Sequence, residues 1–169
     1  MKKIIACLTL ALFTSACGYH LRGSIDVPKE LSQLYISAAE SKGPFVTELR
    51  QLFKSNRINV IDESNAANYS LNILNEKKEK RTAGVGADAL SSAYEITLSV
   101  DYEIRFKDTD KVAKSVATSV RSFNYNTASL SSAAQEEILL EKEMRRDLAQ
   151  QILRRLSAVV KNPPVDSKQ

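Results

Sequence analysis

Residues 94–106 read YEITLSVDYEIRF, a stretch in which apolar and polar side chains alternate without a break. Its seven even-numbered residues are apolar, and its six odd-numbered residues are polar or charged. Because successive side chains of a strand point to opposite faces, the alternation predicts a strand with one face in the core and the other in water. Residues 108–110 (Asp-Thr-Asp) then predict a hairpin turn, and a returning strand is expected over residues 112–123.

A long amphipathic helix is predicted over residues 132–160. Ser132 and Gln135 form a capping-box pattern, and acidic side chains precede basic ones along the segment, as the helix dipole favours. Asn162 and the two prolines after it end the helix. The apolar stripe that would face the core consists of Leu140, Met144, Leu148, Ile152, Leu156 and Val159.

The first half of the chain mixes strand and helix patterns. Short strands are expected over residues 34–36 and 58–61, and a longer strand over residues 69–81. Between the first two strands, apolar residues at helical spacing predict a helix over residues 44–55 that opens with a proline. Residues 82–92, rich in glycine and small side chains, are expected to form a mobile loop.

The predicted elements follow the order β-α-β-β-β-β-α. Two short strands separated by a helix form a βαβ unit, so we expect them to be parallel with a right-handed crossover. The prediction is an α+β fold, a two-layer sandwich in which two helices cover one face of a mixed four- to five-stranded sheet. The folded domain is expected over residues 33–161, with residues 162–169 as a disordered tail.

Composition excludes several functional classes. The 169 residues are 43% hydrophobic and 26% charged, which suits one globular domain. Half of the net charge of +4 comes from Lys2 and Lys3, in a segment that we expect to be cleaved, so no nucleic-acid partner is expected. One histidine, His20, and two cysteines leave too few groups for a catalytic or metal site. We therefore expect no enzyme activity and no cofactor.

The N-terminus has the features of a secretory signal. Two lysines precede the apolar residues 4–13, a run of about ten residues, whereas a membrane-spanning helix needs about 20. Small residues then lead to Cys17, which resembles a bacterial lipoprotein signal, and Gly18 implies sorting to the outer membrane. We expect a cleaved signal peptide over residues 1–16, lipid attachment at Cys17 and a tether over residues 17–32 that anchors the protein to a membrane. The alternative is a plain secretory signal with Cys17 as an incidental thiol.

A run of basic residues ends the third predicted strand. In a strand, Lys78 and Lys80 share one face while Lys77 and Arg81 share the other. Lysine and arginine side chains bind phosphate, and lipopolysaccharide contains phosphorylated lipid A, so these four residues are candidates for lipopolysaccharide binding. The alternative is a solvated strand end whose charges pair with neighbouring glutamates.

The start of the expected mature chain resembles a known family. Residues 17–23 read CGYHLRG and are followed by Val27 and Pro28, which is similar to the opening of the lipopolysaccharide-assembly lipoprotein family LptE, also called RlpB. Further agreement lies in the order of the elements and in three short motifs, Gly43-Pro44, Arg121-Ser122-Phe123 and Glu143-Met144.

The resemblance implies a non-enzymatic component of the outer-membrane lipopolysaccharide translocon, lipid-anchored on the periplasmic side. It implies a plug inside the LptD β-barrel that assists assembly of the barrel and binds lipopolysaccharide directly. In this family a basic residue in the loop after the third strand is implicated in lipid contact. Residues 82–92 contain none, so that role would fall to Arg81 and its neighbours.

Candidates for contact with the barrel are Arg121, Phe123 and Tyr125. Aromatic side chains favour the cores of interfaces, and ordinary packing within the fold is an equal alternative for Phe123. The alternative function is a stand-alone, periplasm-facing lipoprotein that binds a lipid or another ligand. That function would need an apolar pocket between sheet and helices, whereas the evenly filled apolar stripes predict a solid core.

Overall fold

The chain folds around one five-stranded sheet in the computed structural model, which describes residues 25, 27–85, 91–107, 109, 111–124 and 130–163. The strand order is β2-β1-β3-β4-β5; β1 is parallel to β2 and β3, and the other neighbours are antiparallel. The predicted α+β fold with a mixed sheet is confirmed. The elements are η1 (Lys29–Ser32), β1 (Gln33–Ala38), α2 (Pro44–Ser55), β2 (Asn59–Ile61), η2 (Ser64–Ala66), β3 (Tyr69–Val85), β4 (Ser91–Phe106), β5 (Val112–Asn124) and α3 (Leu130–Lys161).

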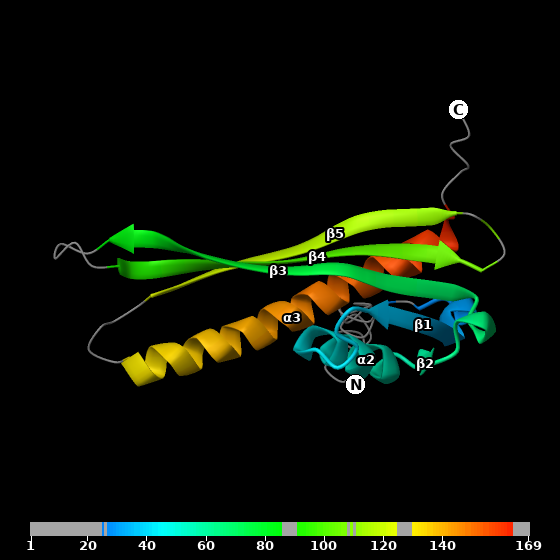
Figure 1. The fold of residues 1–169 in the computed structure, drawn as a ribbon, viewed down its shortest axis with the longest axis horizontal. Coiled ribbons are helices and arrows are strands. Elements are labelled where there is room, and N and C mark those ends of the chain that lie inside the picture. The colour runs from blue at the N-terminus through cyan, green and yellow to red at the C-terminus, as the bar shows by residue number, and fades with distance from the viewer. Residues whose placement is uncertain are drawn as a thin grey trace, which may run out of the picture.

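The three long strands give the molecule its elongated shape. In Figure 1, β3, β4 and β5 run along most of its length, and α3 crosses beneath them. The short strands β1 and β2 continue the sheet beyond one end of β3, and α2 lies beside them and packs against α3. The sheet formed by β3, β4 and β5 therefore has a covered face, toward α3, and an open face on the other side.

The alternation predicted along β4 is confirmed. Ile96 and Ile104 are fully buried, and Val100 and Tyr102 are each 2% exposed. These side chains form a single core with the apolar stripe of α3, whose members Met144, Leu148, Ile152 and Leu156 are at most 1% exposed.

The packed domain begins before residue 33. Leu31, in η1, is fully buried in the core, and Ile25 and Val27 pack against that core in partly buried positions. The last residues of the expected tether therefore lie on the domain. The burial of Leu31 could not be predicted, because it is not part of a run of apolar residues at strand or helix spacing.

The long hairpin of β3 and β4 extends farther than predicted. Thr82 pairs with Tyr94, and Val85 pairs with Ser91, across a ladder with register shifts around Gly84. The prediction of a loop over residues 82–92 is therefore wrong at both ends, where the chain continues as strand. Each strand supplies backbone hydrogen-bond partners to the other, and the pattern of side chains in one segment does not show these partners. Residues 86–90 lie outside the described residues.

The helix α3 begins at Leu130, two residues before the predicted cap. Ser132 lies inside the helix, so the predicted capping box is wrong. Ala133 is 7% exposed, and its packing extends the buried side of the helix beyond the predicted stripe. In the described part of the chain, no helix combines the length and apolarity needed to cross a membrane.

The strand β5 turns its valines away from the core. Val116 and Val120 are 58% and 44% exposed, whereas Ala117 and Ser119 are 2% and 3% exposed. Small side chains on the inner face allow α3 to approach β5 closely, and the bulkier β-branched side chains lie on the open face.

We expect Ile104→Ala to lower the free energy of unfolding by about 2–5 kcal/mol, because it opens a cavity at a fully buried site. Val116→Ala is the matched control on the open face, and we expect it to cost less than about 1 kcal/mol. Urea unfolding followed by circular dichroism measures both. Equal losses for the two variants would contradict the assignment of the covered and open faces.

Candidate functional site

The four predicted basic residues lie on β3 and point to both faces of the sheet. Lys78 and Lys80 face α3 on the covered face, and Lys77 and Arg81 lie on the open face. This division follows from strand alternation, as predicted. Each of the four side chains has a carboxylate partner, and three of those four partnerships join β3 to another element.

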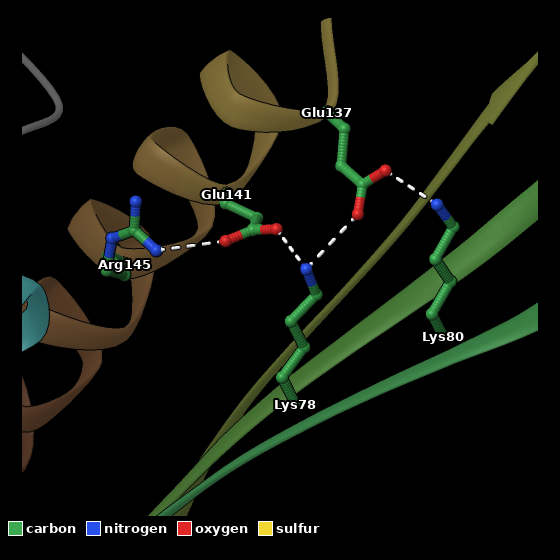
Figure 2. Close-up of polar contacts among 5 residues, drawn as sticks. All are labelled: Lys78, Lys80, Glu137, Glu141 and Arg145. Atoms are coloured by element: carbon green, nitrogen blue, oxygen red, sulfur yellow. Dashed lines mark hydrogen bonds and ion pairs between the residues drawn. The ribbon is translucent and has the colours of Figure 1, made fainter. Parts of the chain in front are cut away.

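Two glutamates of α3 bridge the lysines on the covered face (Figure 2). The Lys78 Nζ lies 3.1 Å from Glu137 Oε1 and also contacts Glu141 Oε1. The Lys80 Nζ lies 2.6 Å from Glu137 Oε2. Arg145, whose Nη1 lies 3.2 Å from Glu141 Oε2, completes the group, and we call these five residues the β3–α3 ion cluster.

The two elements match each other in spacing. Residues four apart on a helix lie about 6 Å apart along its axis, and residues two apart on a strand lie about 6.6 Å apart. Glu137 and Glu141 therefore present carboxylates at nearly the interval at which Lys78 and Lys80 present ammonium groups. The two charge patterns are visible in the sequence, but they are separated by some sixty residues, and only the packing of α3 on β3 brings them together.

Two aromatic rings also contact Lys80. Its Nζ lies 4.5 Å from the ring centroid of Tyr94 and 5.4 Å from that of Phe123, distances at which a cation is attracted to a ring face. Phe123 is 5% exposed and packs against Tyr94, with 5.9 Å between centroids. This burial favours the packing alternative for Phe123 over contact with a barrel. Tyr125 and Cys17 lie outside the described residues.

The basic residues of the open face form more exposed pairs. Lys77 Nζ lies 2.5 Å from Glu79 Oε1 in the same strand, and Arg81 Nη2 lies 2.7 Å from Glu95 Oε1 in β4. The side chains of Lys77 and Arg81 are 61% and 76% exposed. Water and salt screen pairs this exposed, so both cations remain accessible to another anion.

The open face also holds a buried carboxylate that strand alternation does not reveal. Glu103 is 5% exposed; its Oε1 accepts hydrogen bonds from Asn72 Nδ2 at 3.0 Å and from Arg105 Nε at 2.6 Å. These hydrogen bonds, from Asn72 first, hold the pKa of Glu103 below its usual range. Asn72 and Lys114 are the cross-strand neighbours of Glu103, so the register of three strands is needed to predict this site.

Arg121, the third candidate for barrel contact, lies at the edge of the sheet. Its Nη1 donates to the Val120 carbonyl at 2.9 Å, and its Nη2 lies 3.7 Å from Asp147 Oδ2. Gln151 Nε2 donates to the Thr118 carbonyl at 3.0 Å. Side chains thus occupy carbonyls of β5 that would otherwise be open to an additional strand. The sequence does not indicate this role for Arg121.

A cavity of about 440 Å³ opens beside the β3–α3 ion cluster. Ile73, Leu98 and Val100 contribute apolar surface to its lining, and Glu76, Lys78 and Arg145 contribute charged groups. The cavity is open to solvent near the end of β1, and its apolar lining residues Ile73, Leu98 and Val100 are buried members of the single core. Burial and the nearby charge of Glu40 raise the pKa of Glu76, and Arg145 opposes this effect.

Within the described ranges, no group of three or more His, Cys, Asp or Glu side chains is arranged to hold a metal ion.

The chain is similar to lipopolysaccharide-assembly proteins in sequence. The family model LptE, described as lipopolysaccharide-assembly, matches residues 31–156. Two relatives are each named LPS-assembly lipoprotein LptE. The protein from Pectobacterium atrosepticum is 26% identical over 149 residues, which cover 88% of this chain and 80% of the relative. The protein from Photorhabdus laumondii is 28% identical over 148 residues, covering 88% and 81%.

Solved structures of bacterial lipoproteins share the fold. Rare lipoprotein B from Shewanella oneidensis superposes with a TM-score of 0.70 at 19% identity, covering 77% of this chain and 97% of that chain. An uncharacterized lipoprotein B from Nitrosomonas europaea superposes with a TM-score of 0.67 at 22% identity, covering 86% and 94%. At these identities the likeness establishes the fold alone.

The β3–α3 ion cluster is expected to respond to pH. Hydrogen bonds from Lys80 and, more weakly, Lys78 lower the pKa of Glu137 below its ordinary value of 4.5. The hydrogen bond to Glu141 raises the pKa of Lys78 above its ordinary value of 10.5. The stabilisation from Glu137 is therefore present above pH 4.5 and is lost as the pH falls through the lowered pKa. The stabilisation from Lys78 is present below pH 10.5 and is lost as the pH rises through the raised pKa.

We predict that Glu137 titrates below 4.5 in a carboxyl NMR titration and that Glu137→Gln flattens the acidic limb of the stability profile. Glu136→Gln, at the neighbouring exposed position on the same helix, is the control and should leave that limb unchanged. A Glu137 carboxyl that titrates at or above its ordinary value would contradict the ion pairs.

Proposed function

The chain belongs to the LptE lipopolysaccharide-assembly family, and from this premise we propose that it is a lipid-anchored outer-membrane protein of the lipopolysaccharide translocon. In this proposal it plugs the LptD β-barrel, assists the assembly of that barrel and binds lipopolysaccharide. The family is a non-enzymatic family of envelope lipoproteins, so the chain is not an enzyme.

The observation that carries the plug proposal is the open face of β3, β4 and β5. The helices lie on the other side of these strands, and in the part of the chain that the structure describes no element covers the open face (Figure 1). Most of its side chains are polar, such as Thr97, Ser99 and Asp101 on β4, with Val116 and Val120 on the adjoining β5. The lumen of a large barrel is polar, so a mostly polar sheet face is suited to contact it.

The observation that supports lipopolysaccharide binding is the position of the basic residues beside the cavity. An anionic amphiphile needs cations for its phosphates and apolar surface for its chains. Lys78 and Arg145 line the cavity together with Ile73 and Leu98, which supply apolar surface. Lys77 and Arg81 add two accessible cations on the other face of the same strand.

The anchor is tested with Cys17→Ala expressed without LptD. We expect the wild-type protein to fractionate with membranes and the variant to remain soluble, because the acyl chains are lost with the cysteine. Cys7→Ala, in the expected signal segment, is the matched control and should behave as the wild type. A Cys17→Ala protein that still fractionated with membranes would overturn the lipid anchor.

The plug is tested by purification from outer membranes. We expect a tagged protein to bring LptD with it at a one-to-one ratio.

As a contact test, Thr97→Arg and Val116→Arg place bulky charges on the open face and should reduce recovery of LptD. Lys54→Glu, at an exposed position of α2, is the control for a surface change elsewhere. Recovery of the wild-type protein only as a free monomer would favour the stand-alone lipoprotein instead.

Lipopolysaccharide binding is tested by replacing Lys77, Lys78, Lys80 and Arg81 together with glutamine. We expect affinity for purified lipopolysaccharide to fall roughly tenfold and its salt dependence to weaken, because four cations are removed. The matched control removes four exposed lysines elsewhere in the chain and loses the same total charge (Lys29, Lys42, Lys54 and Lys107). Unchanged affinity and salt dependence in the first variant would rule out this site.

A further inference from the structure

The cations proposed to meet lipid phosphate on the covered face already have partners in the free protein. Lys78 contacts both Glu137 and Glu141, and Lys80 lies 2.6 Å from Glu137 Oε2 (Figure 2). The side chains of Lys78 and Lys80 are still 42% and 34% exposed, whereas both glutamates are at most 20% exposed. Solvent therefore reaches the lysines past the carboxylates that hold them.

The segment of α3 that supplies these carboxylates is weakly attached by apolar contacts. Between Ala133 and Met144, which are both buried, Leu140 is the deepest apolar side chain, and it is only partly buried. Ile138 and Leu139 are 66% and 59% exposed. From Met144 onward, by contrast, α3 contributes fully buried residues to the core. Residues 134–143 are therefore held to the rest of the fold by the packing of Leu140 on the core and by the ion pairs of Glu137 and Glu141 with β3.

We infer that Glu137 and Glu141 form an autoinhibitory latch, which occupies Lys78 and Lys80 until a lipid phosphate displaces it. This inference rests on the proposed binding of lipopolysaccharide to the same lysines. When a phosphate group takes the two ammonium groups, the two carboxylates are released, and residues 134–143 lose their main attachment to β3.

The exchange is favoured by charge. A phosphate monoester carries about −1.5 to −2 charges near neutral pH, against −1 for a carboxylate, and offers more acceptor oxygens. Ion pairs in partly exposed positions are also weak, because water and salt compete with them. Lys80 keeps its contacts with Tyr94 and Phe123 during the exchange, which holds its ammonium group close to the vacated position.

The test compares two double variants of equal charge. Glu137→Gln with Glu141→Gln removes the latch, and Glu136→Gln with Glu143→Gln removes two exposed charges from the same helix without touching Lys78 or Lys80. We expect the latch variant to bind diphosphorylated lipid A roughly three- to tenfold more tightly than wild type, and more tightly than the control variant. Equal tightening in both variants would overturn the latch and leave only a general charge effect.

The same titrations distinguish the source of the phosphate. Lipid A without phosphates should bind the wild type and the latch variant equally, because it cannot replace the carboxylates. Inorganic phosphate should compete with lipid A more effectively in the latch variant than in the control. A gain in affinity for the phosphate-free lipid as large as that for diphosphorylated lipid A would overturn the inference.

Hydrogen exchange on the wild-type protein gives a second measurement that does not depend on a variant's folding. We expect amides of residues 134–143 to exchange faster once diphosphorylated lipid A is bound, while amides from Met144 onward stay protected. Stronger protection of residues 134–143 in the complex would show that the helix stays closed and would overturn the latch. If neither the wild type nor any variant binds lipid A, the proposed binding of lipopolysaccharide is wrong. If the wild type, the latch variant and the control variant all bind lipid A with equal affinity, lipopolysaccharide binding stands and only the latch is refuted.

Discussion

One face of β4 has to be buried, and the rest of the fold is arranged around that requirement. Seven apolar side chains alternate along the strand, and most of them are buried in a core to which α3 contributes its apolar stripe. Pairing with β3 on one side and β5 on the other satisfies the backbone of β4 along its length. Because one helix layer suffices to bury this core, the opposite face of three long strands is left open.

Periodic patterns in the sequence predict most of this architecture, and contacts between distant segments account for what they miss. The alternation over residues 94–106 and the helical spacing after Pro44 each depend on a single segment, so both could be predicted. The end of β3 depends on the residues that face Thr82–Val85 in β4. The outward direction of Val116 in β5 depends on which face of that strand α3 covers. Neither can be inferred from the local sequence.

In the candidate site, too, local patterns predict some features, and contacts between distant segments determine the rest. Strand alternation predicts that Lys78 and Lys80 share a face, but their partners Glu137 and Glu141 come from a helix some sixty residues away. A basic run that looks like a positive patch in the sequence is thus largely neutralised in the folded protein. What distinguishes it from an ordinary surface network is its position beside a cavity with both apolar and charged lining. Phe123 is a further example, since its burial against Tyr94 follows from the pairing of β4 with β5.

The edge of β5 bears on how a partner could contact the protein. A long edge strand usually invites pairing with another strand, and its free carbonyls are the groups that would be used. Here Gln151 holds the carbonyl of Thr118, and Arg121 holds that of Val120 while lying near Asp147. Strand addition along this part of the edge would have to break these contacts before it gained any of its own. A partner that surrounds the protein and contacts its open face breaks none of them, so the arrangement of β5 favours enclosure over extension of the sheet.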